Sequence, residues 1–141
     1  MKTLLRNIAA VVLGFVVALV VNKSLIDLAP HVIAPPAGLD MTTLEGVTAA
    51  MPLLEPRHFI FPFLAHALGT LVGAFVAAMV AASNRMKFAL AIGVLNLLAG
   101  IAAVAMIPAP LWFEVVDLAF AYIPMGILGG MLALRIRPDL R

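Results

Sequence analysis

The sequence predicts an all-α integral membrane protein folded as an antiparallel four-helix bundle. Three observations lead to this class: 65% of the 141 residues are hydrophobic, only 11% are charged, and four apolar stretches are long enough to cross a bilayer. Ordinary soluble domains carry about 25% charged residues, and a small domain has a large surface to cover with them. The composition therefore argues against a soluble globule, and it excludes a disordered chain, which needs low hydrophobicity.

The four spans follow from length and hydropathy. About 20 helical residues cross the roughly 30 Å of hydrocarbon in a bilayer, and we expect spans over residues 4–21, 59–82, 88–107 and 111–134 of a single domain, 1–141. The first span resembles a signal peptide, but its apolar run exceeds the roughly 7–15 residues typical of that class. No small-x-small cleavage site follows it, so we expect an uncleaved helix.

Basic residues fall unevenly on the two sides of the predicted bundle. If the spans alternate in direction, only Lys23 and Arg57 lie on the outer side. The positive-inside rule then predicts a cytoplasmic location for both termini and for the turn at 83–87. The basic residues on that side are Lys2, Arg6, Arg85, Lys87, Arg135, Arg137 and Arg141.

The one long connection, 22–58, lies outside and is interrupted by prolines. Within it, Thr42 and Glu45 have the spacing of a capping box. Apolar residues from Leu44 to Met51 repeat at helical spacing. We therefore expect a short amphipathic helix in this loop. It serves either as a connector that shields the loop backbone or as a lid over an outward-facing cavity.

Small residues recur along every span, and the other connections, at 83–87 and 108–110, are short. Short links make consecutive spans antiparallel neighbours. Lipid is as apolar as leucine, so close packing at small residues does much to hold membrane helices together. We expect these residues to pack mostly within the chain, which leaves dimerisation open. The glycines in these stripes are Gly14, Gly69, Gly73, Gly93, Gly100, Gly126 and Gly130.

Pro124 lies inside the fourth predicted span. Proline removes a backbone donor and clashes with the preceding turn, so it kinks a helix. The carbonyl left without its partner is that of Phe120. The kink is either a static packing bend or a hinge.

Ionisable residues inside a span are costly and therefore mark candidate sites. At about 1.5 Å per residue, His66 and Asp117 both lie about 10 Å below the outer boundary. A His–Asp pair at this level would relieve the desolvation cost of each partner. Glu114 lies one turn above Asp117. Tyr122 is about 140° around the helix from Asp117, so these two should not face one neighbour squarely.

A second polar layer, made of Thr70, Asn96 and Tyr122, lies near the midplane. Thr70 and Asn96 share helix faces with the small residues, so they should point into the bundle. Such groups can simply bond helices together, for about 0.6–2 kcal/mol each. The alternative is an outward-open polar pocket that binds a proton, a cation or a small polar ligand.

Other chemistries have little support. The chain has no cysteine, no HxxxH spacing, and no phosphate-binding, dinucleotide-binding or GxSxG motif. His66 is the only histidine deep in a span, so haem held by two histidines is not expected. The net charge of +2 reflects membrane topology rather than nucleic-acid binding. We expect no metal, no cofactor and no enzymatic activity.

The run PFLAHALGT at 62–70, within residues 58–82, resembles a family of small bacterial four-span inner-membrane proteins with no known activity. The similarity extends to PLWF at 110–113 and AYIPM at 121–125. The resemblance implies four spans and a bacterial inner membrane, and it implies no activity. We expect a non-enzymatic accessory or scaffold subunit, in a homo-oligomer or a larger membrane complex. The alternative is a small transporter or channel that uses His66, Asp117 and Asn96.

Overall fold

The computed structural model describes residues 1–38 and 40–138, so Arg141 of the predicted basic side lies outside the described residues. Within these residues the regular structure is helical. Two short 3₁₀ turns, η1 (Met51–Leu53) and η2 (Pro56–Phe59), precede the third helix. The α-helices are α1 (Lys2–Val32), α2 (Leu44–Ala50), α3 (Ile60–Val80), α4 (Arg85–Met106), α5 (Leu111–Phe120) and α6 (Ile123–Ile136).

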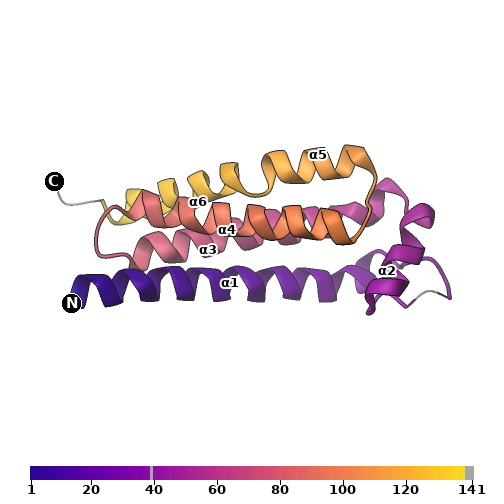
Figure 1. Cartoon of the computed structure of the whole chain (residues 1–141), viewed down its shortest axis with the longest axis horizontal. Coiled ribbons are helices and arrows are strands. Elements are labelled where there is room, and N and C mark those ends of the chain that lie inside the picture. The colour runs from indigo at the N-terminus through magenta and orange to yellow at the C-terminus, as the bar shows by residue number, and fades with distance from the viewer. Residues whose placement is uncertain (39, 139–141) are drawn as a thin grey trace.

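Four helical segments in the described part of the chain are long and apolar enough to cross a membrane. They are α1, η2 with α3, α4, and α5 with α6. The predicted all-α class and its four long apolar helices are therefore confirmed. The N-terminus and the end of α6 lie at one end of the molecule, the terminus end (Figure 1). The described residues of segment 33–59 lie at the other end, the loop end.

Helix α1 extends well beyond the predicted span 4–21. It continues to Val32 because polar side chains sustain the helix after the apolar run ends. Lys23 Nζ donates to Asp27 at 2.7–2.8 Å, one turn away, and the Ser24 hydroxyl donates to the Val20 carbonyl at 2.8 Å. Hydropathy detects the apolar part of a helix and not the helix itself. The irregular segment therefore begins at residue 33 rather than 22.

The short helix of the loop is present as α2, but its cap differs from the predicted one. The N-cap is Thr43, whose hydroxyl accepts from the Gly46 amide at 3.1 Å. Thr42 instead donates, through its amide and its hydroxyl, to the Asp40 carboxylate at 2.9 and 2.5 Å. These bonds to the charged form lower the pKa of Asp40, with the hydroxyl contributing most. The helix therefore starts two residues after Thr42.

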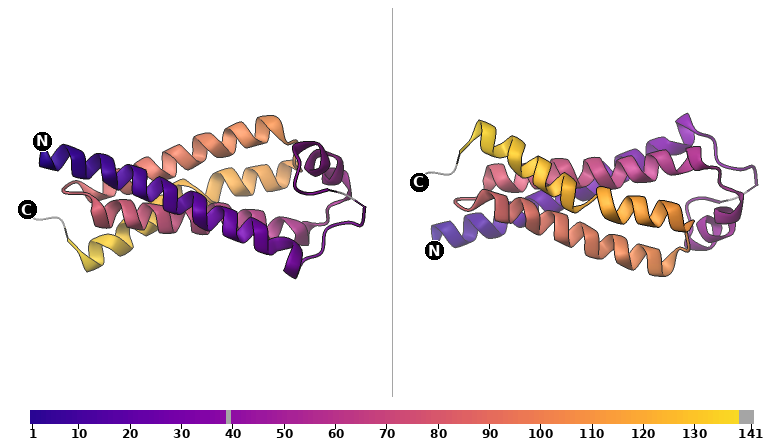
Figure 2. Two further views of the ribbon diagram at one scale, coloured as in Figure 1. Left: turned by 90° about the horizontal axis from the view of Figure 1, so that it is seen from below. Right: turned by 90° about the horizontal axis from the view of Figure 1, so that it is seen from above.

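Helix α3 lies in the middle of the molecule and packs against α1, α4 and α6. Its contact with α1 is close because small residues face each other. A methyl group on Gly73 would lie 2.5 Å from the Gly14 carbonyl oxygen, and one on Gly69 would lie 2.9 Å from the Ala18 carbonyl oxygen. The Gly69–Gly73 pair thus packs against α1 of the same chain, and α1 crosses α3 obliquely (Figure 2).

Glycines also bring α4 and α6 together. The Gly93 and Gly126 backbones meet, because a methyl group on Gly126 would lie 3.3 Å from the Gly93 Cα. Further toward the terminus end, a methyl group on Gly130 would lie 2.7 Å from Met86 Sδ and 2.8 Å from Ala89 Cβ. Since the backbones approach this closely, the two helices gain van der Waals contact that larger residues would prevent.

Three arginines from distant parts of the chain cap the end of α3. The last carbonyls of a helix have no partner within it, and guanidinium groups carry charge that suits a helix C-terminus. The last turn of α3 is therefore tied to α1, to α4 and to the end of α6. The bonds are Arg6 Nε to Val80 O at 2.7 Å, Arg137 Nη1 to Met79 O at 2.8 Å, and Arg85 Nη1 to Ala78 O at 3.4 Å.

The fourth predicted span is two helices rather than one bent helix. Helix α5 ends at Phe120, and α6 begins at Ile123 with Pro124 in its first turn. Proline is favourable there because its missing amide would have no intrahelical partner. Tyr122 lies between the helices with φ −118° and ψ −77°. The interruption at Pro124 was predicted, but it is not a kink in one helix. It is a break between two helices, α5 and α6, each with its own direction.

Candidate functional site

Asp117 of α5 lies at the centre of a buried hydrogen-bond network. Nδ1 of His66, on α3, is 2.9 Å from both carboxylate oxygens of Asp117. The Tyr122 hydroxyl donates to Asp117 Oδ2 at 2.8 Å. The Asp117 side chain is 5% exposed and that of His66 is 26% exposed. His66 thus connects the buried carboxylate to a more accessible part of the molecule.

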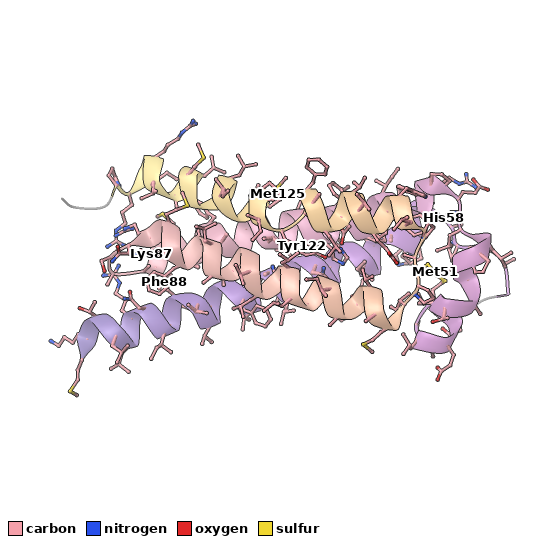
Figure 3. The ribbon with its side chains drawn as sticks, turned by 45° about the horizontal axis from the view of Figure 1, so that its top comes forward. Met51, His58, Lys87, Phe88, Tyr122 and Met125 are labelled. Carbon is pink, nitrogen blue, oxygen red and sulfur yellow. The ribbon has the colours of Figure 1, made fainter. Side chains whose placement is uncertain are left out.

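Tyr122 and Asp117 meet because the helix is broken between them. On one continuous helix they would be about 140° apart, so the expectation that they face different neighbours is wrong. The break at residues 121–122 lets the Tyr122 ring turn back under α5, and the ring also stacks on His66 with centroids 5.7 Å apart. Figure 3 shows Tyr122 at the break, near the middle of the molecule's length.

The Tyr122 ring fits because Gly100 of α4 has no side chain. A methyl group on Gly100 would lie 2.5 Å from the Tyr122 hydroxyl oxygen. Tyr122 is 2% exposed, so the ring has little room to move away. Gly100 therefore makes room for the ring of Tyr122, in addition to its expected part in helix packing.

The second polar layer joins α3 to α4. Asn96 Nδ2 donates to Thr70 Oγ1 at 2.9 Å. Thr70 is fully buried, whereas Asn96 is partly exposed. The two residues lie at one level, as counting along the spans predicted.

A cavity of about 190 Å³ lies beside both polar layers. One water needs roughly 10–15 Å³ of this kind of volume and two to four polar partners, so the cavity has room for several waters or a small chemical group. Its remaining walls are small or aliphatic residues of α1, α3 and α4. The polar side chains that line it are Asn22, His66, Thr70, Asn96 and Tyr122.

Two predicted pocket residues lie outside the cavity lining. Asp117 stands behind His66 and Tyr122 and reaches the cavity only through them. Glu114 instead accepts from the Ala109 amide at 3.2 Å and so stabilises the turn before α5. The Ala109 amide precedes α5 and takes no part in the hydrogen bonds of that helix, so a side chain must supply its acceptor.

Asn22 lines the cavity and was not predicted as a site residue. The predicted first span ends at residue 21, whereas α1 continues through Asn22, which faces α3 and α4. The signal that could have found it is the Lys23–Asp27 spacing, which favours a helix beyond the apolar run.

The amphipathic helix does not cover this cavity, because no described residue of 33–59 contributes to its lining. The loop is instead tied to the start of α3. His58 Nδ1 accepts from the Glu55 amide at 2.9 Å, and His58 Nε2 lies 3.2 Å from the Ala34 carbonyl oxygen. Figure 3 shows His58 and Met51 together at the loop end. The connector role fits α2 better than the lid role.

Within residues 1–38 and 40–138, no three His, Asp or Glu side chains gather as a metal site would require. Comparison with protein-family models, with curated proteins and with solved structures finds no match for this chain. The functional argument therefore depends on the geometry of the cavity.

Proposed function

We propose that this chain is a multi-pass protein of the bacterial inner membrane whose cavity binds a small polar ligand, and that it acts as a small transporter. The observation that carries the proposal is His66, which lines the cavity and whose Nδ1 also lies 2.9 Å from Asp117. A polar group in a span is costly, and it is retained where it meets a partner or a ligand.

The arrangement favours a ligand over a metal cation. Both oxygens of Asp117 already lie within hydrogen-bond distance of His66, and Oδ2 also accepts from Tyr122. Asp117 also lies outside the lining, so a cation in the cavity would meet no carboxylate among the described lining residues, although hard cations prefer such ligands. Neutral amide and hydroxyl groups, from Asn22, Thr70 and Asn96, suit hydrogen bonding to a small polar molecule.

The proposal includes a topology. The four long helices cross the membrane as antiparallel neighbours, with both termini cytoplasmic. Support comes from the described basic residues, because Arg6, Arg85 and Arg137 all gather at the terminus end. Such a concentration marks the cytoplasmic side of a bacterial membrane protein.

An accessory or scaffold role is a second proposal, and one feature of α1 favours it. In the most apolar 18-residue stretch of α1, only 17% is buried inside the molecule, less than in the other three long segments of the described chain. The exposed surface of α1 can pack on lipid, on a second copy, or on a subunit of a larger complex. Copurification from native membranes tests this role. A stable stoichiometric partner is expected, and recovery of the chain alone after mild solubilisation contradicts it.

Binding can be measured on the protein in lipid nanodiscs with ¹⁵N-labelled histidine. Acetate and acetamide serve as small polar probes, and we expect saturable shifts of the His66 ring signals. His31 and His58 supply internal controls, since neither lines the cavity. His66→Phe removes the responding signals and identifies them. Absence of any saturable shift with either probe would overturn the proposed binding function.

Transport is tested in proteoliposomes with labelled acetate. Wild-type protein should accelerate uptake, and Asn96→Leu should abolish the acceleration by replacing a polar wall with an apolar one. Val94→Leu, on an exposed face of the same helix, is the matched control and should leave uptake unchanged. Binding without accelerated uptake would reduce the function to ligand binding alone.

A further inference from the structure

We propose that the ligand is a membrane-dissolved amphiphile, whose polar head hydrogen-bonds to His66 and whose apolar tail leaves sideways between α1 and α4. This inference rests on the proposed function, because it names the ligand class of the same cavity. Three features carry it: the direction of the mouth, its height along the helices, and the His66 ring nitrogen that is turned away from Asp117.

The cavity opens on the side of the molecule. Helices α1 and α4 both pack on α3 but make far less contact with each other, and they diverge toward the loop end (Figure 2). The cavity lies between them, with α3 as its floor and Tyr122 behind. Leu19 of α1 lines the cavity although it is 52% exposed, and Ala99 of α4 is likewise both lining and exposed. These two residues, together with the lining residue Ala103 of α4, therefore form the rim of a lateral mouth.

The mouth lies in the outer half of the proposed spans. His66 is six residues into α3, which places it about 9 Å below the start of that helix. Leu19 lies in the apolar run of α1, one turn before the exposed Lys23–Asp27 ion pair. With no described loop residue in the lining, the mouth faces the outer part of the acyl chains, and the head-group region lies close to it.

A polar floor that faces hydrocarbon favours a polar occupant. Unsatisfied polar groups in an apolar medium cost several kcal/mol. A head group on the floor would satisfy His66 and Asn96, while a tail in the mouth would contact Leu19 and Ala99. The lining offers both a polar and an apolar surface, because it contains alanines and glycines as well as these polar groups. An amphiphile matches both surfaces, whereas a wholly polar solute matches only the floor.

The His66–Asp117 pair determines which ring atom the head meets. Nδ1 of His66 lies 2.9 Å from both carboxylate oxygens of Asp117, so that edge of the ring is occupied. Nε2 is therefore the ring nitrogen that a ligand in the cavity can reach. A carboxylic acid head suits this position, because a carboxyl group can donate or accept a hydrogen bond.

Photolabelling tests the lateral route on the full chain in nanodiscs. The probe is palmitic acid with a diazirine in its tail, and its headless control is the corresponding diazirine alkane. We expect the acid to label the rim, at Leu19, Ala99 or Ala103, and an excess of palmitic acid to suppress that labelling. The alkane should label exposed lipid-facing positions without preference for the rim. Equal rim labelling by both probes would overturn the role of the head.

Leu19→Trp fills the mouth and should abolish rim labelling at Ala99 and Ala103. Val20→Trp is the matched control, because Val20 is 59% exposed on the same helix and does not line the cavity. Ala99→Leu blocks the mouth from the α4 side. Loss of labelling in this variant too would show that blockage of the mouth, and not a local effect of the tryptophan, is the cause. Rim labelling that survives both Leu19→Trp and Ala99→Leu contradicts lateral entry.

His66→Phe tests the head contact and should weaken competition by palmitic acid by roughly five- to tenfold, the usual worth of one hydrogen bond. The small probes separate this inference from the proposed function. If acetate shifts the His66 signals but palmitic acid neither shifts them nor competes, the polar cavity stands and the amphiphile fails. If palmitic acid, acetate and acetamide all leave the His66 signals unchanged, both proposals fail.

Discussion

His66 Nδ1 lies 2.9 Å from both carboxylate oxygens of Asp117, and this contact joins α3 to α5 across 51 positions of sequence. The two helices make few other backbone approaches, since α3 packs mainly on α1, α4 and α6. The pair therefore holds α5 against the molecule at the level of the cavity. It has a structural role that can be measured separately from any ligand.

A double-mutant cycle on His66 and Asp117 should show strong coupling. His66→Leu leaves Asp117 with Tyr122 as its remaining partner, and loss of one member of a buried pair costs about 3 kcal/mol. The double variant with Asp117→Leu should recover part of that loss, giving a coupling free energy of about 1–3 kcal/mol. The measurement is the free energy of unfolding in mixed micelles. Additive losses, with no coupling, would show that the two side chains only pack.

Tyr122→Phe should lower the free energy of unfolding by about 1 kcal/mol, because it removes one hydrogen bond to Asp117 and keeps the ring against Gly100. Gly100→Ala should cost more, since the added methyl group would lie 2.5 Å from the Tyr122 oxygen and must displace a buried ring. Thermal unfolding followed by circular dichroism compares the two variants. A Gly100→Ala protein as stable as the wild type would contradict the close contact.

Alanine substitutions at two packing glycines should differ in severity. A methyl group on Gly73 would lie 2.5 Å from the Gly14 carbonyl oxygen, whereas one on Gly93 finds its nearest atom, the Tyr122 carbonyl oxygen, at 3.2 Å. Gly73→Ala should therefore destabilise by about 2 kcal/mol, and Gly93→Ala by less than about 1 kcal/mol. Unfolding in detergent titrations provides the ranking. The reverse order would indicate that α1 does not approach α3 as closely as described.

Arg6→Met should destabilise the terminus end by about 0.5–1 kcal/mol, because the Val80 carbonyl loses a charged donor at the end of α3. Lys2→Met is the control, since it removes a positive charge from the same end of α1 without removing a bond to α3. Amide hydrogen exchange in the last turn of α3 reports the local effect. Equal exchange in both variants would mean that charge alone, and not the cap, matters there.

The turn before α2 should respond to acid through Asp40. Its bonds with Thr42 lower the pKa of the carboxyl group below the usual 3.8, so the ionised form stabilises the turn. That contribution is fully present above pH 3.8 and is lost as the pH falls through the lowered pKa. The Thr42 amide shift should titrate with a midpoint below 3.8, and Thr42→Val should move the midpoint of the Asp40 carboxyl signal upward. A wild-type midpoint above 3.8 contradicts these bonds.

Several features of the site were predictable because they depend on counting along helices. The common level of His66 and Asp117 follows from the rise per residue, and so does the level shared by Thr70 and Asn96. Tyr122 was misplaced because the count assumed a continuous helix through Pro124. Asn22 was missed because hydropathy marks where the apolar run ends, whereas α1 continues on polar side-chain bonds.

The sequence by itself determined the four long apolar helices and the small residues along them, because both depend on local composition and a fixed helical period. Only the tertiary structure decided which faces meet. It turned Tyr122 back onto Asp117 at a helix break, used Gly69 and Gly73 against α1, and left a cavity open between α1 and α4. These outcomes depend on backbone approaches of a few ångströms between distant segments, and no local pattern encodes such approaches.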